Sequence, residues 1–143
     1  MTDLATSELP SAISMQRLAM DLEDWKYPSP LPATVTLPAL ESRLTQAQSR
    51  LTAATSQEVA KALSMLRKLF SPPKDFDATT VEIYQTMLDL PADLLVEATR
   101  RACQNNKFFP KPAELRELVS TELRQRKRDV QHTETALMVA RRL

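Results

Sequence analysis

The chain of 143 residues contains no glycine, although glycine makes up about 7% of typical proteins. Motifs in which bare backbone approaches a phosphate group, such as P-loops and dinucleotide-binding fingerprints, are therefore excluded. The sequence has one cysteine, Cys103, and one histidine, His132. A disulfide within the chain and a zinc site made of cysteine and histidine are therefore excluded as well.

Long hydrophobic runs and a charge imbalance are also missing. No run approaches the roughly 18 apolar residues that predict a membrane-spanning helix, and residues 1–4 lack the basic region and apolar stretch of a signal peptide. We expect a cytoplasmic protein with no membrane partner. Lysine and arginine number 19 and aspartate and glutamate 18, so the formal net charge is +1. This composition is typical of one ordinary domain that buries a core.

Ten prolines separate segments that have helical patterns. Residues 11–22 have a weak amphipathic pattern, and residues 27–37 contain three X-Pro steps, which favour extended backbone and predict a linker. Leucine and alanine then recur at spacings of three and four over residues 37–54, which favours a helix packed along a narrow seam. This spacing leaves open whether the seam packs within the chain or pairs two copies.

Two capping boxes, Thr55–Glu58 and Thr79–Glu82, each predict a helix start, because a hydroxyl and a carboxylate can satisfy two free backbone N–H groups there. Pro91 and Pro112 fit the first turn of two further helices, since proline needs no N–H donor at that position. Phe108 and Phe109 lie in the short segment between these helices. Their rings could stack on nucleic-acid bases, but aromatic residues in such a short link more often fill the core, and we expect both rings to do so.

The pattern as a whole predicts an all-α fold, because no segment alternates cleanly between apolar and polar residues as a strand does. We predict a small helical bundle with a proline-rich N-terminal linker and a projecting basic C-terminal helix. The expected divisions are an N-terminal extension and linker over 1–36, a helical domain over 37–123 and a basic helical tail over 124–143. The tail carries six basic and two acidic residues.

The residue types that carry out catalysis do not occur at catalytic spacings. The densest acidic group, Asp75, Asp77 and Glu82, is best explained as favourable charge at a helix start. Cys103 fits a packed core thiol, and His132 lies in a polar tail where we expect it to be solvated. We therefore expect a protein that is not an enzyme and needs no cofactor or metal.

The basic run of the tail contains Arg124, Arg126, Lys127 and Arg128. These side chains could form a solvated helix face, contact a protein partner or neutralise nucleic-acid phosphates. Because the net charge is only +1, we expect weak or no direct DNA binding. Trp25 and Tyr27 lie beside the proline-rich segment and could be either exposed anchors for a partner or packed side chains.

Four segments follow one another in a specific order: Leu66–Pro72, Val81–Pro91, Leu94–Ala98 and Phe109–Arg116. This order resembles the phage loader-and-inhibitor proteins of the replicative helicase. In that family an aromatic-containing helix, a Leu-x-Asp-Leu turn, an alanine-bearing helix and a segment of the form Phe-Pro-x-x-Ala-Glu-Leu/Ile-Arg recur. The resemblance covers about residues 58–119, and residues 1–54 have no counterpart in it.

The resemblance implies a protein that binds the hexameric helicase, holds its ATPase and DNA binding in check and delivers it to an origin-bound initiator. The segment from Arg116 to Leu143 would face the helicase, and the helical body would face the initiator. The implied partner-binding residues are Arg116, Arg124, Arg126, Lys127 and Arg128.

Two other functions remain open from the sequence. The protein could be a small helical regulator that binds nucleic acid through the basic run. It could also be a phage assembly adaptor that self-associates through a leucine seam consisting of Leu37, Leu40, Leu44 and Leu51. The sequence does not predict the oligomeric state.

Overall fold

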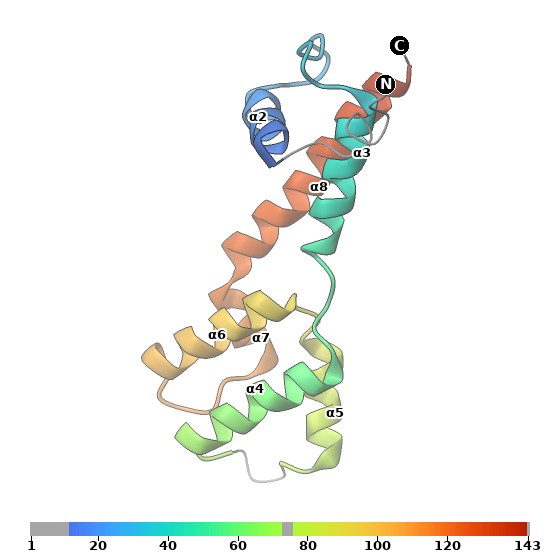
Figure 1. Cartoon of the computed structure of the whole chain (residues 1–143). Helices are drawn as coiled ribbons and strands as arrows, with labels where there is room; N and C mark the ends of the chain where they lie inside the picture. Colours follow the sequence, from blue (N-terminus) through green and yellow to red (C-terminus); the bar gives the residue numbers. More distant parts are fainter. Residues whose placement is uncertain (1–11, 73–75, 143) are drawn as a thin grey trace. The chain divides into compact units, whose positions relative to one another are not determined.

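The computed structural model describes residues 12–72 and 76–142, and these residues form seven helices and no strand (Figure 1). The predicted all-α fold class is confirmed. Asp75 lies outside the described residues. The helices are α2 (Ala12–Glu23), α3 (Leu37–Ser49), α4 (Ser56–Leu69), α5 (Ala78–Met87), α6 (Ala92–Asn105), α7 (Pro112–Leu118) and α8 (Ser120–Arg141).

The chain forms two compact units, each with its own apolar core. The first unit contains the described residues up to Arg50 and those from Arg126 onward, and the second is Leu51–Gln125. These units differ from the expected divisions at 36/37 and 123/124, because α3 packs with residues of the C-terminal tail and not with the helices that follow it in the sequence.

The core of the first unit combines residues that are far apart in the sequence. The tail, which we expected to project, instead buries Ala136 and Leu137, because these apolar side chains need cover from water. The segment expected to be a linker also contributes to the core. The buried members are Leu18, Leu22, Trp25, Val35, Leu40, Ala136 and Leu137.

Helix α3 is shorter than its seam pattern predicts and ends at Ser49. Leu40 and Ala47 are buried within the unit, which favours packing of the seam inside the chain. Polar contacts join α3 to α8 as well, since an Arg43 Nη2 donates to an Asp129 carboxylate oxygen at 3.0 Å. Figure 1 shows the two helices side by side.

The second unit begins its first helix at a complete capping box. The Thr55 hydroxyl accepts a hydrogen bond from the Glu58 N–H at 3.2 Å, and the Glu58 carboxylate accepts one from the Thr55 N–H at 2.8 Å. The predicted start of α4 is confirmed. Pro112 is also the first residue of α7 as predicted, and the Glu114 carboxylate accepts the Lys111 N–H at 2.9 Å.

The predicted second capping box at Thr79–Glu82 is wrong. Helix α5 begins earlier, at Ala78, because the Asp77 carboxylate accepts the Thr80 N–H at 3.0 Å and so caps the helix. Aspartate caps a helix at least as well as threonine. The hydrogen bond from the Thr80 amide lowers the pKa of the Asp77 carboxyl.

The core of the second unit is built around α4, α6 and the irregular segment before α7. Helix α6 begins directly after Pro91 and presents a face of leucine and alanine. The backbone leaves helical geometry at Val119 (φ −123°, ψ 20°), and this separates α7 from α8. The buried members of the core are Val59, Ala62, Leu63, Leu66, Tyr84, Leu88, Leu90, Leu94, Leu95, Ala98, Ala102, Phe109, Leu115 and Val119.

The start of α5 gives a direct test of these assignments. Asp77→Ala removes the capping carboxylate, so we expect the free energy of unfolding to fall by about 1 kcal/mol. Thr79→Ala serves as the control, because Thr79 lies inside the first turn, and the change should stay within about 0.5 kcal/mol. Chemical denaturation followed by circular dichroism measures both values. Equal losses in the two variants would contradict Asp77 as the cap.

Candidate functional site

The exposed side of α8 carries three of the predicted partner-binding residues. Arg124, Lys127 and Arg128 are spaced i, i+3 and i+4, which places them on one side of a helix. All three side chains are exposed and, within 12–72 and 76–142, none takes part in an ion pair. The geometry therefore offers three available cations on one helix face.

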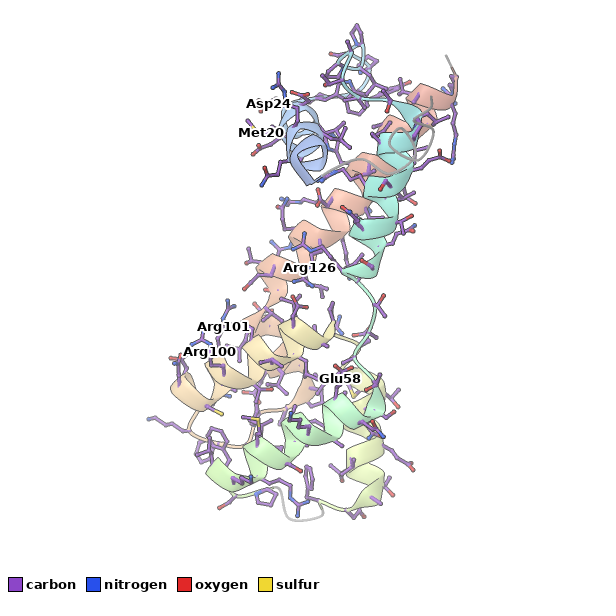
Figure 2. The ribbon with its side chains drawn as sticks, viewed as in Figure 1. Met20, Asp24, Glu58, Arg100, Arg101 and Arg126 are labelled. Carbon is purple, nitrogen blue, oxygen red and sulfur yellow. The ribbon has the colours of Figure 1, made fainter. Side chains whose placement is uncertain are left out.

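Arg126 does not belong to this face. It lies on the opposite side of α8 with the buried Thr133, and only 9% of it is exposed. Its Nη1 donates to the carbonyl oxygen of Arg50 at 2.8 Å, at the C-terminal end of α3 (Figure 2). Arg126 therefore differs from the exposed cations of α8, because its guanidinium is used inside the first unit.

Arg116 is also engaged within its own unit. The residue is half-buried in α7, and its guanidinium forms an ion pair with the carboxylate of Asp89. A partner would have to compete with this carboxylate. Arg116 therefore differs from the available cations of α8, although the resemblance implies one shared role for them.

A network of arginines and glutamates joins α6 to the start of α8 in the second unit. Arg101 Nε donates to Glu97 at 2.8 Å, and other nitrogens of Arg101 donate to Glu122 and to the carbonyl oxygen of Leu118. Arg100 Nε donates to Glu97 at 3.1 Å. Figure 2 shows Arg100 and Arg101 on α6. Both arginines are therefore paired and add nothing to the basic face of α8.

These hydrogen bonds change the acidity of both glutamates. The guanidinium groups of Arg100 and Arg101 stabilise the charged carboxylate and lower the pKa of Glu97 to about 2. Arg101 likewise lowers the pKa of Glu122. Because an ion pair accounts for each shift, neither carboxyl has the raised pKa that a general acid needs.

The aromatic residues divide between burial and exposure. Trp25 is buried, and its ring lies 5.5 Å from that of His132 between centroids. Its carbonyl oxygen lies 2.8 Å from His132 Nε2, so the expected solvated histidine is instead packed in the first unit. Phe109 is buried as predicted, whereas Phe108 is 82% exposed, and the prediction that both rings fill the core is wrong for Phe108.

The chemical groups considered for catalysis are dispersed. Cys103 is half-buried and packs against the core of the second unit. No group of three or more histidine, cysteine, aspartate or glutamate residues suited to a metal occurs in the described part of the chain. None of the helices among those residues combines the length and apolar character that crossing a membrane requires.

Comparisons of the chain with protein-family models, with curated proteins and with solved structures found no match. The resemblance to helicase loaders therefore stays a prediction.

Mutation can separate the structural role of Arg126 from the exposed position of Lys127 on α8. Arg126→Ala removes the charged donor of a part-buried hydrogen bond to the Arg50 carbonyl oxygen, so we expect the free energy of unfolding to fall by about 2 kcal/mol. The matched change Lys127→Ala removes an exposed side chain and should alter it by less than about 0.5 kcal/mol. Trp25 is the only tryptophan, so its fluorescence during denaturation reports the first unit. Equal stability of the two variants would contradict the assigned role of Arg126.

The pairing of Glu97 predicts a dependence of stability on pH. The pKa of the Glu97 carboxyl is about 2 in the folded protein and ordinarily 4.5. The contribution of its ion pairs to the free energy of unfolding is therefore complete above pH 4.5 and is lost as the pH falls toward 2. Titration of the Glu97 carboxyl by NMR should give a midpoint near the lower value. Glu97→Gln should reduce the loss of stability over this range, and an unchanged pH profile would contradict the pairing.

Proposed function

We propose that the protein is a non-enzymatic accessory protein of phage or prophage DNA replication that binds the replicative helicase. The resemblance over residues 58–119 supports the identity of the partner. One structural observation supports the position of the binding site. Arg124, Lys127 and Arg128 are exposed on the side of α8 opposite its buried residues, and none of them forms an ion pair with a described residue.

The three cations are suited to an acidic surface on a protein. Exposed charges of one sign accelerate association with a complementary surface and select against partners of the same charge. Because no carboxylate of the described chain has to be displaced first, their full charge is available to a partner. We propose that this face contacts the helicase and that the helical body contacts an origin-bound initiator.

The regulator alternative relies on the same three side chains, since cations on a helix can also neutralise phosphates. It predicts DNA affinity that depends on this face and falls steeply with salt. The assembly-adaptor alternative has less support, because Leu40 of its proposed seam is fully buried within the first unit and Leu44 is half-buried.

The helicase proposal is tested by retention of the full-length protein on immobilised replicative helicase in the presence of ATP. Arg124→Gln, Lys127→Gln and Arg128→Gln are combined in one variant, and we expect its affinity to fall about tenfold. Deletion of the tail is unsuitable, because it would also remove Ala136 and Leu137 from the core of the first unit.

The control variant combines Lys26→Gln, Lys61→Gln and Lys68→Gln, which removes the same charge from exposed positions outside α8. It should bind the helicase as the unaltered protein does. Absence of retention of the unaltered protein would refute the helicase proposal, and equal retention of the two variants would refute the role of the α8 face.

A further inference from the structure

Phe108 is a large apolar side chain that is mostly exposed to solvent. It lies in the irregular segment between α6 and α7, and 82% of it is accessible. No other large hydrophobic side chain of the described residues is as exposed, and Val96 comes next at 68%. An aromatic ring held in water loses the free energy that burial would provide, so this position is a candidate for contact with a ligand.

The backbone that carries Phe108 is firmly anchored. The next residue, Phe109, is buried, with its ring 5.2 Å from that of Phe76 and 6.0 Å from that of Tyr84 between centroids. The Tyr84 hydroxyl donates to the carbonyl oxygen of Pro110 at 2.8 Å, and this hydrogen bond is buried. Phe108 therefore projects from a preorganised support, which lowers the entropy lost on binding.

The charges beside Phe108 are positive and available. Lys107 and Lys111 are exposed, and neither ammonium group forms an ion pair with any residue that the structure describes. The chain contains no acidic residue between Ala98 and Ala113. Because consecutive residues span at most about 3.6 Å each, both lysines start within about 11 Å of the Phe108 Cα atom.

We propose that Phe108, Lys107 and Lys111 form a binding site for single-stranded nucleic acid. The Phe108 ring stacks on an unpaired base, and the two ammonium groups contact phosphates on either side of it. Base stacking on exposed aromatic rings, with cations along the backbone, is how single strands are bound without sequence preference. This proposal does not depend on helicase binding, which we assign to α8.

The surroundings of the ring favour a nucleic acid over a protein. Aromatic anchors at protein interfaces lie in apolar, desolvated patches from which lysine is depleted. Phe108 instead follows Asn105, Asn106 and Lys107 in the chain, and all three are polar. Single strands are favoured over duplexes, because the face of a paired base is already covered by its stacked neighbours.

The test measures binding of the full-length protein to fluorescently labelled oligothymidylate by anisotropy, beside a duplex of the same length. Phe108→Ala should weaken binding to the single strand about tenfold, whereas Phe108→Trp should preserve it because indole also stacks. Lys107→Gln combined with Lys111→Gln should reduce the slope of log affinity against log salt by about 1.4, from two phosphate contacts.

The controls are Met87→Ala, which removes another exposed apolar side chain of the same unit, and Lys61→Gln combined with Lys68→Gln. Both should bind the single strand as the unaltered protein does. Absence of binding at low salt, equal affinity for the duplex, or full affinity of Phe108→Ala would each overturn the proposal.

Retention on the helicase is measured for the same variants. This measurement distinguishes a failure of the helicase proposal from a failure of the nucleic-acid proposal. Phe108→Ala should keep its helicase affinity. Loss of helicase binding with unchanged oligonucleotide binding would show that Phe108 contacts protein and would overturn the nucleic-acid site.

Discussion

Glycine is the residue that most easily takes left-handed backbone geometry at the end of a helix, and this chain has none. This constraint affects the connections between the described helices. No described residue has a positive φ. Helices α4 and α6 are instead followed by the C-cap residues Phe70 and Asn106, whose ψ angles of 145° and 148° are extended. Phe108, which is exposed beside the buried Phe109, lies in the connection that follows Asn106.

Burial of apolar side chains determines which surfaces remain for partners. Helix α8 buries Ala136 and Leu137 in the first unit, so the helical repeat turns Arg124, Lys127 and Arg128 toward water. A tail that projected freely would expose these cations without a fixed arrangement. In the folded chain they instead share one face of a regular helix, and binding to a flat or concave acidic surface then needs little further ordering.

The cations of the described residues divide into a structural group, which is bonded within its own unit, and an available group, which contains Arg124 and Arg128 as well as several lysines. Arg101, Arg116 and Arg126 each bind a carboxylate or a carbonyl oxygen within their own unit. The planar guanidinium offers several donors in fixed directions and suits such sites. The ammonium groups of Lys107, Lys111 and Lys127 remain exposed and outside ion pairs of the described residues. Both proposed binding sites contain lysines of this second group.

The local part of the fold could be predicted from the sequence because its signals lie within a few residues of one another. The capping box at Thr55, the proline at the start of α7 and the all-α class needed no knowledge of distant contacts. The cap of α5 was also local, and it was missed because Asp77 competes with the threonines that follow it.

The tertiary structure decided what each basic and aromatic side chain is available to do. Arg126 and Lys127 are adjacent and alike in the sequence, yet one is bonded to a carbonyl oxygen contributed by a residue 76 positions away, while the other is exposed. Phe108 and Phe109 differ in the same way. The sequence by itself determined which residue types and which helices the chain has, because propensity and capping act locally. Only tertiary packing determined which of those side chains remain free to bind, because burial depends on partners that are distant along the chain.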